Sequence, residues 1–130
     1  MIVGIGVDII EVRRIEAAIE RYGERFLRRV FTDVERQYCD RFGQRRALHY
    51  AARFAAKEAF SKAIRTGMRP PCSWNAISVV NGQLGEPELL LGDELARRYS
   101  GYRFHVSLSH TATHAVAVVV AELEDHSRTR

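Results

Sequence analysis

The sequence predicts an α+β fold with a mainly antiparallel sheet, and three observations favour it. Within residues 11–66, apolar residues recur at the three-to-four-residue spacing of helices. From residue 75 onward they alternate with a period of two, which is typical of strands. One strand-like run, residues 2–10, precedes the helices. Helices early in the chain and strands late in it are typical of α+β proteins, whereas regular alternation of the two is typical of parallel sheets.

Three helices are expected in the first half. The first covers residues 11–22, whose apolar positions follow the helical period. Thr32 and Glu35 have the spacing of a capping box and begin a short helix that Gly43 closes. The third covers residues 45–66, which are rich in Ala and contain no Pro or Gly, a composition that favours helix.

The second half is expected to be mostly strands. Asn81-Gly82 is typical of a hairpin turn and separates two of them. In chain order, the expected elements are strands at 75–80 and 88–91, a short helix at 93–99, and strands at 103–109 and 114–123.

The length and composition predict one domain. A chain of 130 residues with 46% hydrophobic residues can bury a core, which we expect over residues 1–124, with a disordered tail at 125–130. The cysteines, Cys39 and Cys72, are too few for a disulfide framework and favour a reducing compartment, the cytoplasm. No signal-peptide pattern and no run of about 20 apolar residues is present, so no membrane segment is expected.

The positive charge belongs to the first half of the chain. Residues 1–65 contain 14 Lys or Arg against 9 Asp or Glu, whereas residues 66–130 contain 6 against 7. All basic residues except Lys57 and Lys62 are arginines, which fits an anionic partner because the guanidinium group binds phosphate and carboxylate well. A codon bias that replaces Lys by Arg would also explain this ratio, although not its uneven distribution.

An acid lies inside the first apolar strand. The alternation places Asp8 on the same face as Gly4 and Gly6. A carboxylate taken out of water costs several kcal/mol unless something compensates it, and glycines inside a strand often mark the close approach of another backbone. We therefore expect a helix or a ligand to pack tightly beside Asp8, together with a group that neutralises its charge.

The long helix offers such groups. Glu58 and Lys62 are four residues apart and share one helix face. Two carboxylates, Asp8 and Glu58, with a lysine nearby form a suitable seat for Mg²⁺, which commonly takes one or two protein carboxylates and completes its shell with phosphate and water. Two alternatives need no metal: a solvated Glu58–Lys62 pair, and an Asp8 that pairs with Lys62 or caps the helix near Val12.

Other patterns predict less. Gly4 and Gly6 do not extend into a dinucleotide-binding fingerprint, because the position of its third glycine is Ile9. His105 lies on the polar face of the strand expected at 103–109, a pattern that any solvent-facing sheet also produces.

Four segments, in this order, are GIGVDIIEVRRIE at 4–16, FTDVERQYC at 31–39, RFAAKEAFSKA at 53–63 and FHVSLSHT at 104–111. Together they resemble the bacterial holo-acyl-carrier-protein synthases, the short trimeric type of 4′-phosphopantetheinyl transferase. The resemblance covers nearly the whole chain, and the combination of G-x-D with K-E-A-x-x-K is specific. It departs at Arg65, where the family often has a small residue, and at His114, where an aromatic residue is common.

The resemblance implies an activity. This is the Mg²⁺-dependent transfer of the phosphopantetheine arm from coenzyme A to a serine of apo acyl carrier protein, releasing adenosine 3′,5′-bisphosphate, in fatty acid biosynthesis. It implies that Asp8 and Glu58 are the metal ligands and that Lys62 holds the transferring phosphate. Glu58, a water on the metal and Glu35 all remain candidates for the base that takes the serine proton.

The resemblance also implies partners. It implies a homotrimer with active sites at the subunit interfaces, where His105 of one chain approaches the nucleotide held by its neighbour. Arg45 and Arg53 are expected contacts of the 3′-phosphate, with solvated helix arginines as the alternative. Acyl carrier proteins are acidic as a class, so the first helix is expected to bind the carrier through basic residues. These are Arg13, Arg14 and Arg21.

Some features of the sequence also fit two other function classes. A sequence pI near 9.4 and clustered arginines fit a nucleic-acid-binding module. No recognition motif accompanies the arginines, however, and Asp8 and Glu58 would repel nucleic-acid phosphates. A Mg²⁺-dependent nuclease or nucleotide hydrolase shares the metal chemistry. We therefore expect a transferase with neither a nucleic-acid nor a membrane partner.

Overall fold

The computed structural model describes residues 1–124, so the tail expected to be disordered at 125–130 lies outside the described residues. The elements are β1 (Ile2–Glu11), α1 (Val12–Tyr22), α2 (Glu24–Val30), α3 (Asp33–Asp40), the short 3₁₀ helix η1 (Gly43–Arg45), α4 (Arg46–Ala63), a second 3₁₀ helix η2 (Trp74–Ala76), β2 (Ile77–Asn81), β3 (Pro87–Leu91), α5 (Asp93–Arg98), β4 (Tyr102–His110) and β5 (His114–Leu123).

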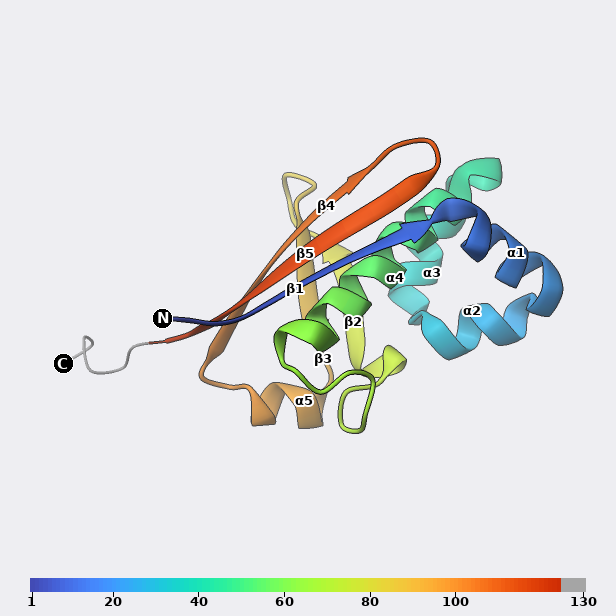
Figure 1. The fold of residues 1–130 in the computed structure, drawn as a ribbon. Coiled ribbons are helices and arrows are strands. Elements are labelled where there is room, and N and C mark those ends of the chain that lie inside the picture. Colours follow the sequence, from blue (N-terminus) through green and yellow to red (C-terminus); the bar gives the residue numbers. More distant parts are fainter. Residues whose placement is uncertain (125–130) are drawn as a thin grey trace.

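The expected α+β fold is confirmed. Two separate antiparallel sheets are present, one with the strand order β1-β5-β4 and one formed by β2 and β3. Figure 1 shows the three long strands of the first sheet side by side, with α4 running across one face of them and the α1–α3 helices gathered beyond one end. The first strand of the chain, β1, therefore pairs with the last one, β5.

Helix α4 forms the centre of the core. It packs against β1, β5 and β4 on one side and against α3 and β2 on others. Twelve of its eighteen residues are buried, and seven of these are alanines. Small side chains allow neighbouring backbones to approach the helix closely while alanine keeps helix propensity high. The Ala-rich composition thus determines both the helix and its central position.

The glycine face of β1 abuts α4, as expected. A Cβ atom added to Gly4 would lie 2.0 Å from the carbonyl oxygen of Ala63, and one added to Gly6 would lie 1.9 Å from that of Ala59. Only glycine fits where a strand and a helix backbone approach this closely. These two positions bring the segment that contains Asp8 against α4.

The opposite face of the three-stranded sheet is open. Its exposed apolar residues on β1 are Ile5, Val7 and Ile9, of which Ile5 and Ile9 are each 65% exposed. Across the sheet, these residues pair in register with Val120, Val118 and Val116 of β5, which in turn pair with His105, Ser107 and Ser109 of β4. The polar face expected for β4 is therefore continuous with an apolar surface that is exposed on β1 and half-buried on β5.

Several boundaries differ from the expected ones. Helix α2 was not expected at all. Helix α4 ends at Ala63 rather than at residue 66, because Arg65 has a left-handed φ of 64° and the N–H groups of Thr66 and Gly67 both donate to the carbonyl of Ser61. Helix α3 ends at Asp40, before the glycine expected to close it.

The β2–β3 connection is also longer than expected. Asn81 is the last residue of β2 and pairs with Pro87, so the turn occupies residues 82–86 rather than Asn81-Gly82. Gly85 has φ of 86°, which only glycine adopts without strain. The conformation of this turn therefore depends on Gly85 as well as on Gly82.

Across residues 1–124, none of the helices has the length and apolarity required to cross a membrane.

Candidate active site

Asp8 lies on the α4-facing side of β1, opposite Ala117 of β5. Its side chain is 18% exposed, so most of the carboxylate is removed from water. The possibility that it caps the following helix is wrong, because α1 begins after Glu11 and no side-chain hydrogen bond caps it. Asp8 is therefore turned towards α4 and not towards the start of α1.

Lys62 of α4 reaches this carboxylate. Its Nζ lies 3.2 Å from Oδ1 of Asp8 and donates a second hydrogen bond, 3.0 Å long, to the carbonyl oxygen of Val7. Glu58 lies one turn earlier on the same helix face and is half-buried. Two elements thus bring Asp8, Glu58 and Lys62 into one cluster, which we call the carboxylate–lysine cluster.

The electrostatics of this cluster favour a cation. Burial raises the pKa of the Glu58 carboxyl above its usual value, the negative charge of Asp8 raises it further, and the ammonium of Lys62 opposes both. Because the negative charge of Asp8 disfavours ionisation of Glu58, a positive ion placed between the two carboxylates would stabilise the charged form of Glu58.

The donor set fits Mg²⁺ better than a metal that needs a complete protein cage. Residues 1–124 contain no group of three or more His, Cys, Asp or Glu side chains that could surround an ion. Asp8 and Glu58 supply two carboxylates, and a hard ion such as Mg²⁺ binds through one or two of these and keeps its other positions for phosphate oxygens and water. The metal role of these two residues stays a prediction.

Glu35 does not join the cluster. It is fully buried and forms an ion pair of 2.5 Å with Lys57, which is also fully buried. Its Oε1 accepts the backbone N–H of Thr32 in the expected capping box, and its Oε2 accepts that of Val79 in β2. Because its lone pairs are used inside the core, Glu35 has no access to a serine hydroxyl, and its expected role as a base is not supported.

Lys57 is a residue whose role the sequence did not reveal. Its Nζ donates to the carbonyl oxygens of Val30 (2.8 Å) and Trp74 (2.9 Å) as well as to Glu35. Burial lowers the pKa of Lys57, and the carboxylate of Glu35 opposes that shift. The two lysines of the K-E-A-F-S-K motif therefore differ: Lys57 is inside the core, and Lys62 is half-exposed at the cluster.

The expected nucleotide contacts lie elsewhere on the chain. Arg53 is only 3% exposed, so the solvated-arginine alternative is wrong for this residue. Its Nη2 donates to Asn81 of β2 at 2.8 Å, its guanidinium lies 4.2 Å from the ring centroid of Tyr38, and its Nε has no hydrogen-bond partner among the described residues. Arg45 is exposed in η1. Arg53, nine residues before Lys62, lies on the opposite side of α4 from it.

His105 is also remote from the carboxylate–lysine cluster within one chain. It lies on the open face of the sheet, exposed, two strands away from β1. Its Nε2 lies 2.9 Å from Oε1 of Glu122, and this hydrogen bond lowers the pKa of Glu122. His105 and Asp8 belong to opposite faces of the same sheet.

The expected carrier-binding residues form part of a larger basic surface. Arg13, Arg14 and Arg21 are exposed on α1, and α2 adds three more exposed arginines. The added residues are Arg25, Arg28 and Arg29. Within the described chain, none of these six arginines forms a salt bridge. The same two helices expose three glutamates, Glu16, Glu20 and Glu24, so the surface of α1 and α2, which we call the basic surface, keeps an excess of three positive charges (6 − 3) for an anionic partner.

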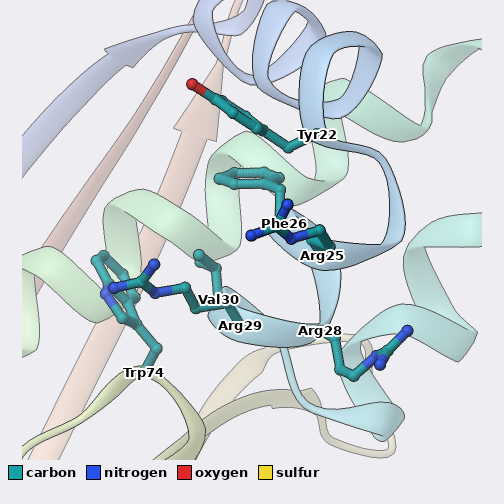
Figure 2. A pocket seen from close by; sticks show the side chains of 7 residues that line it. All are labelled: Tyr22, Arg25, Phe26, Arg28, Arg29, Val30 and Trp74. Carbon is teal, nitrogen blue, oxygen red and sulfur yellow. The ribbon is translucent and has the colours of Figure 1, made fainter.

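A hollow of about 860 Å³ lies in this basic surface. Figure 2 shows Tyr22 and Phe26 on one side of it and Trp74 on the other, with Val30 between them; Arg29 extends towards Trp74 in this view, whereas Arg28 points away from it. The hollow combines aromatic side chains with arginines, a composition typical of protein-binding surfaces. The apolar residues at positions 26, 27 and 30 were the available signal for α2, but seven residues are too few to establish a helical period.

Comparisons with known proteins agree with one another. Residues 4–119 match the family model described as the 4′-phosphopantetheinyl transferase superfamily. A holo-acyl-carrier-protein synthase of Methylorubrum populi is 46% identical over 129 residues, covering 94% of this chain and 94% of that protein. The crystal structure of a holo-acyl-carrier-protein synthase from Neisseria meningitidis aligns with a TM-score of 0.86 and 35% identity, covering 94% of this chain and 99% of that one. One from Bacillus anthracis, in complex with CoA (3′,5′-ADP), gives a TM-score of 0.82 and 40% identity over 95% and 99%.

Proposed function

The chain belongs to the 4′-phosphopantetheinyl transferase superfamily, and from this premise we propose that it transfers the 4′-phosphopantetheine arm of coenzyme A to a serine of apo acyl carrier protein. The products are the holo carrier protein and adenosine 3′,5′-bisphosphate. The single observation that carries the proposal is the carboxylate–lysine cluster, in which Lys62 lies 3.2 Å from Asp8 beside Glu58.

The reaction is a phosphoryl transfer at the β-phosphorus of coenzyme A. The serine oxygen forms a bond to that phosphorus, the bond to the bridging oxygen breaks, and the leaving nucleotide keeps the electron pair. Catalysis of this kind depends mainly on positioning and on neutralising charge. Magnesium held by Asp8 and Glu58 would neutralise charge on the pyrophosphate. Lys62 has one further donor after Asp8 and Val7, and this N–H is available to a phosphate oxygen.

Glu58 is the protein side chain best suited to receive the serine proton. It lies one turn before Lys62 on the same helix face and beside Asp8, where the transferring phosphate is expected to lie. The other candidate side chain, Glu35, is fully buried in the pair with Lys57. A water at the site remains the second possibility.

We propose that three chains assemble through the open sheet face. A contiguous exposed apolar surface of this kind is typical of interfaces. Arg53 contacts β2 whereas Lys62 contacts β1, and His105 lies on the far face of the sheet. Contact of one nucleotide with both Lys62 and His105 is best reconciled if a neighbouring chain supplies His105.

The carrier protein is proposed to bind the basic surface of α1 and α2. Asp8 is four residues before the start of α1, so a serine presented by a carrier on this surface would be close to the cluster. An acidic partner is attracted by these six exposed arginines, which form no salt bridge within residues 1–124, and exposed charges of this kind act chiefly on encounter. The free, buried thiols of Cys39 and Cys72 support the expected cytoplasmic setting.

The test is to incubate the protein with coenzyme A, Mg²⁺ and an apo carrier protein and to weigh the carrier by mass spectrometry. We expect the mass of one phosphopantetheine arm to be added. Asp8→Asn and Glu58→Gln should each abolish transfer, whereas Glu88→Gln, an exposed acid on β3, should not. An unmodified carrier with the wild-type protein would refute the activity.

The metal role has a separate readout. Mg²⁺ with coenzyme A should raise the melting temperature of the wild-type protein and of Glu88→Gln, but not of Asp8→Asn or Glu58→Gln. If Asp8 serves only as the partner of Lys62, Asp8→Asn should instead lower the melting temperature and leave turnover per folded molecule unchanged.

A further inference from the structure

The buried pair of Lys57 and Glu35 joins five parts of the fold at one point. Lys57 belongs to α4 and donates to Val30, the last residue of α2, and to Trp74, the first residue of η2. Glu35 belongs to α3 and accepts from Thr32 at the start of that helix and from Val79 of β2. Both side chains are fully buried.

Helix α2 depends on few other attachments. Its main neighbours are α1 and η2 rather than α4. Leu27, Val30 and the following Phe31 are buried and anchor it by apolar contact. Apolar contacts hold a helix against the core but tolerate small shifts, whereas a short hydrogen bond to a fixed ammonium determines where the helix ends. Within residues 1–124, the Lys57–Val30 bond is the side-chain hydrogen bond that links α4 to the end of α2.

Trp74 extends the same link towards the carboxylate–lysine cluster. Its carbonyl accepts from Lys57, and its indole ring stacks on Phe54 with centroids 4.9 Å apart. Phe54 lies one turn before Glu58 on α4. Trp74 also lines the hollow beside α2, so one residue touches the proposed carrier surface and the helix that carries Glu58 and Lys62.

Stability alone gives no reason to keep this pair. Two charges removed from water cost as much as their attraction returns, and replacing a buried pair by apolar residues of similar volume is often neutral or stabilising. A buried pair that is retained is therefore more informative about geometry than about stability, because its directional bonds select one arrangement of the elements that it joins.

We propose that Lys57 is a positioning residue: its ammonium fixes the C-terminal end of α2 against α4 and so sets the carrier-binding surface relative to the residues that handle the phosphate. The inference rests on the proposed function, in that α2 is taken to contact the carrier. A serine presented by the carrier must reach the β-phosphorus in line, and a displacement of about 1 Å costs on the order of a hundredfold in rate. Lys57 acts through α2 and Trp74 and does not touch either substrate.

The charge and the hydrogen bonds of the pair are separable by substitution. Lys57→Met keeps the length of the side chain but removes all three donors. Glu35→Gln removes the negative charge, keeps one oxygen for the Thr32 N–H and leaves Lys57 free to donate to Val30 and Trp74. It also turns an NH₂ group towards the Val79 N–H and leaves the ammonium without a counter-charge, so it should lower the melting temperature and its kinetics are compared per folded molecule. The double variant Lys57→Met/Glu35→Gln avoids leaving a buried carboxylate unpaired and serves if Lys57→Met does not fold.

The experiment measures steady-state transfer to an apo carrier protein and, separately, binding of coenzyme A with Mg²⁺ by calorimetry. We expect kcat/KM for the carrier to fall at least about tenfold in Lys57→Met and in the double variant. The Kd for coenzyme A should stay within about twofold. Glu35→Gln should retain most of the carrier efficiency and an unchanged pH profile, a result incompatible with Glu35 being the base.

Hydrogen exchange provides a readout that does not depend on activity. The N–H of Phe31 donates to the carbonyl of Leu27 at the end of α2, 2.9 Å away. This amide should exchange faster in Lys57→Met, while amides of β5 should keep their protection. Leu95→Ala, a substitution of a buried residue in α5, is the control for general destabilisation. It should lower the melting temperature while kcat/KM for the carrier and the Kd for coenzyme A both stay near their wild-type values.

The outcomes are distinguishable. If the wild-type protein modifies no carrier, the proposed function fails, whatever the exchange data show. If the wild-type protein is active and Lys57→Met loses carrier and coenzyme A affinity equally, or changes neither, the positioning role is refuted. The same is true if Leu95→Ala reproduces the kinetic effect at an equal loss of melting temperature.

Discussion

The substitution Gly6→Ala tests whether the close approach of β1 to α4 forms the active site. The added Cβ would lie 1.9 Å from the carbonyl oxygen of Ala59 and 2.8 Å from the backbone nitrogen of Ala63. Both atoms belong to the backbone of α4, so no side chain can rotate away. The strand or the helix must move.

The size of the effect follows from these distances. A carbon–oxygen contact is ordinary at about 3.3 Å, so the two backbones must separate by about 1.4 Å. Overpacking of a core costs up to about 3 kcal/mol when neighbours cannot rearrange. For a chain of this length that corresponds to a fall of about 10 °C in melting temperature. Asp8 is two residues from Gly6, so the displacement also separates it from Lys62, and we expect transfer to fall about a hundredfold.

Thermal unfolding and carrier transfer measured on the same preparations check this expectation. Gly92→Ala is the matched control, because a Cβ there has its nearest neighbour at 3.5 Å, which is ordinary contact, and φ is −64°. It should melt within a few degrees of the wild-type protein and remain active. A Gly6→Ala protein that keeps both the wild-type melting temperature and the wild-type rate would show that β1 and α4 are not in contact as described.

Four further predictions concern single groups. Arg14→Glu should raise the KM for the carrier several-fold and leave coenzyme A affinity unaltered, with the wild-type KM rising as salt is added; equal losses for both substrates would place Arg14 at the nucleotide. Because the pKa of Glu58 is raised in the fold, its ionised form destabilises the metal-free protein above the usual pKa of 4.5. Glu58→Gln should thus melt higher than the wild type near neutral pH, and this gain should vanish below pH 4.5; a lower melting temperature near neutral pH would contradict it. Burial raises the pKa of Cys39 to about 12 and also raises the pKa of Cys72. A thiol reagent should therefore modify both cysteines slowly in the native protein and rapidly once it is unfolded, and rapid labelling of the native protein would refute this. Val7→Glu on the open sheet face should reduce the molar mass in light scattering from a trimer to a monomer, and an unchanged mass would exclude this face as the interface.

The carboxylate–lysine cluster could be predicted from the sequence because strand alternation and helix spacing determine which face of an element each of its residues occupies. Asp8 was conspicuous because a carboxylate interrupts an apolar alternation, and Gly4 and Gly6 marked the close approach of α4. Glu58 and Lys62 shared a face through the fixed geometry of a helix that lacks Pro and Gly. These inferences needed only the period of the backbone and the cost of burying charge.

Other parts depend on tertiary packing, which local pattern does not encode. Glu35 has the same capping-box spacing whether its second oxygen faces solvent or accepts Val79 from a strand 44 residues away. Arg53 was expected at a nucleotide or in water, and its bond to Asn81 arises only when β2 packs beside α4. Helix α2 was missed because a seven-residue element is stabilised by its neighbours rather than by its own period.

Lysine occurs at only two of the 20 basic positions of this chain, Lys57 and Lys62, and the geometry of each position favours lysine over arginine. Lys57 meets three acceptors, the carbonyl oxygens of Val30 and Trp74 and the carboxylate of Glu35, from three different elements. Such an arrangement suits the compact ammonium, whose three donors rotate, and not a planar guanidinium, whose donors lie in one plane. Lys62 likewise uses two donors on β1 and keeps a third. A codon bias towards arginine would act on every basic position alike, so the geometry of these two positions best explains why they are lysine. The ammonium of Lys57 joins helices inside the core. Five residues later, the ammonium of Lys62 contacts Asp8, the carboxylate that interrupts the first strand.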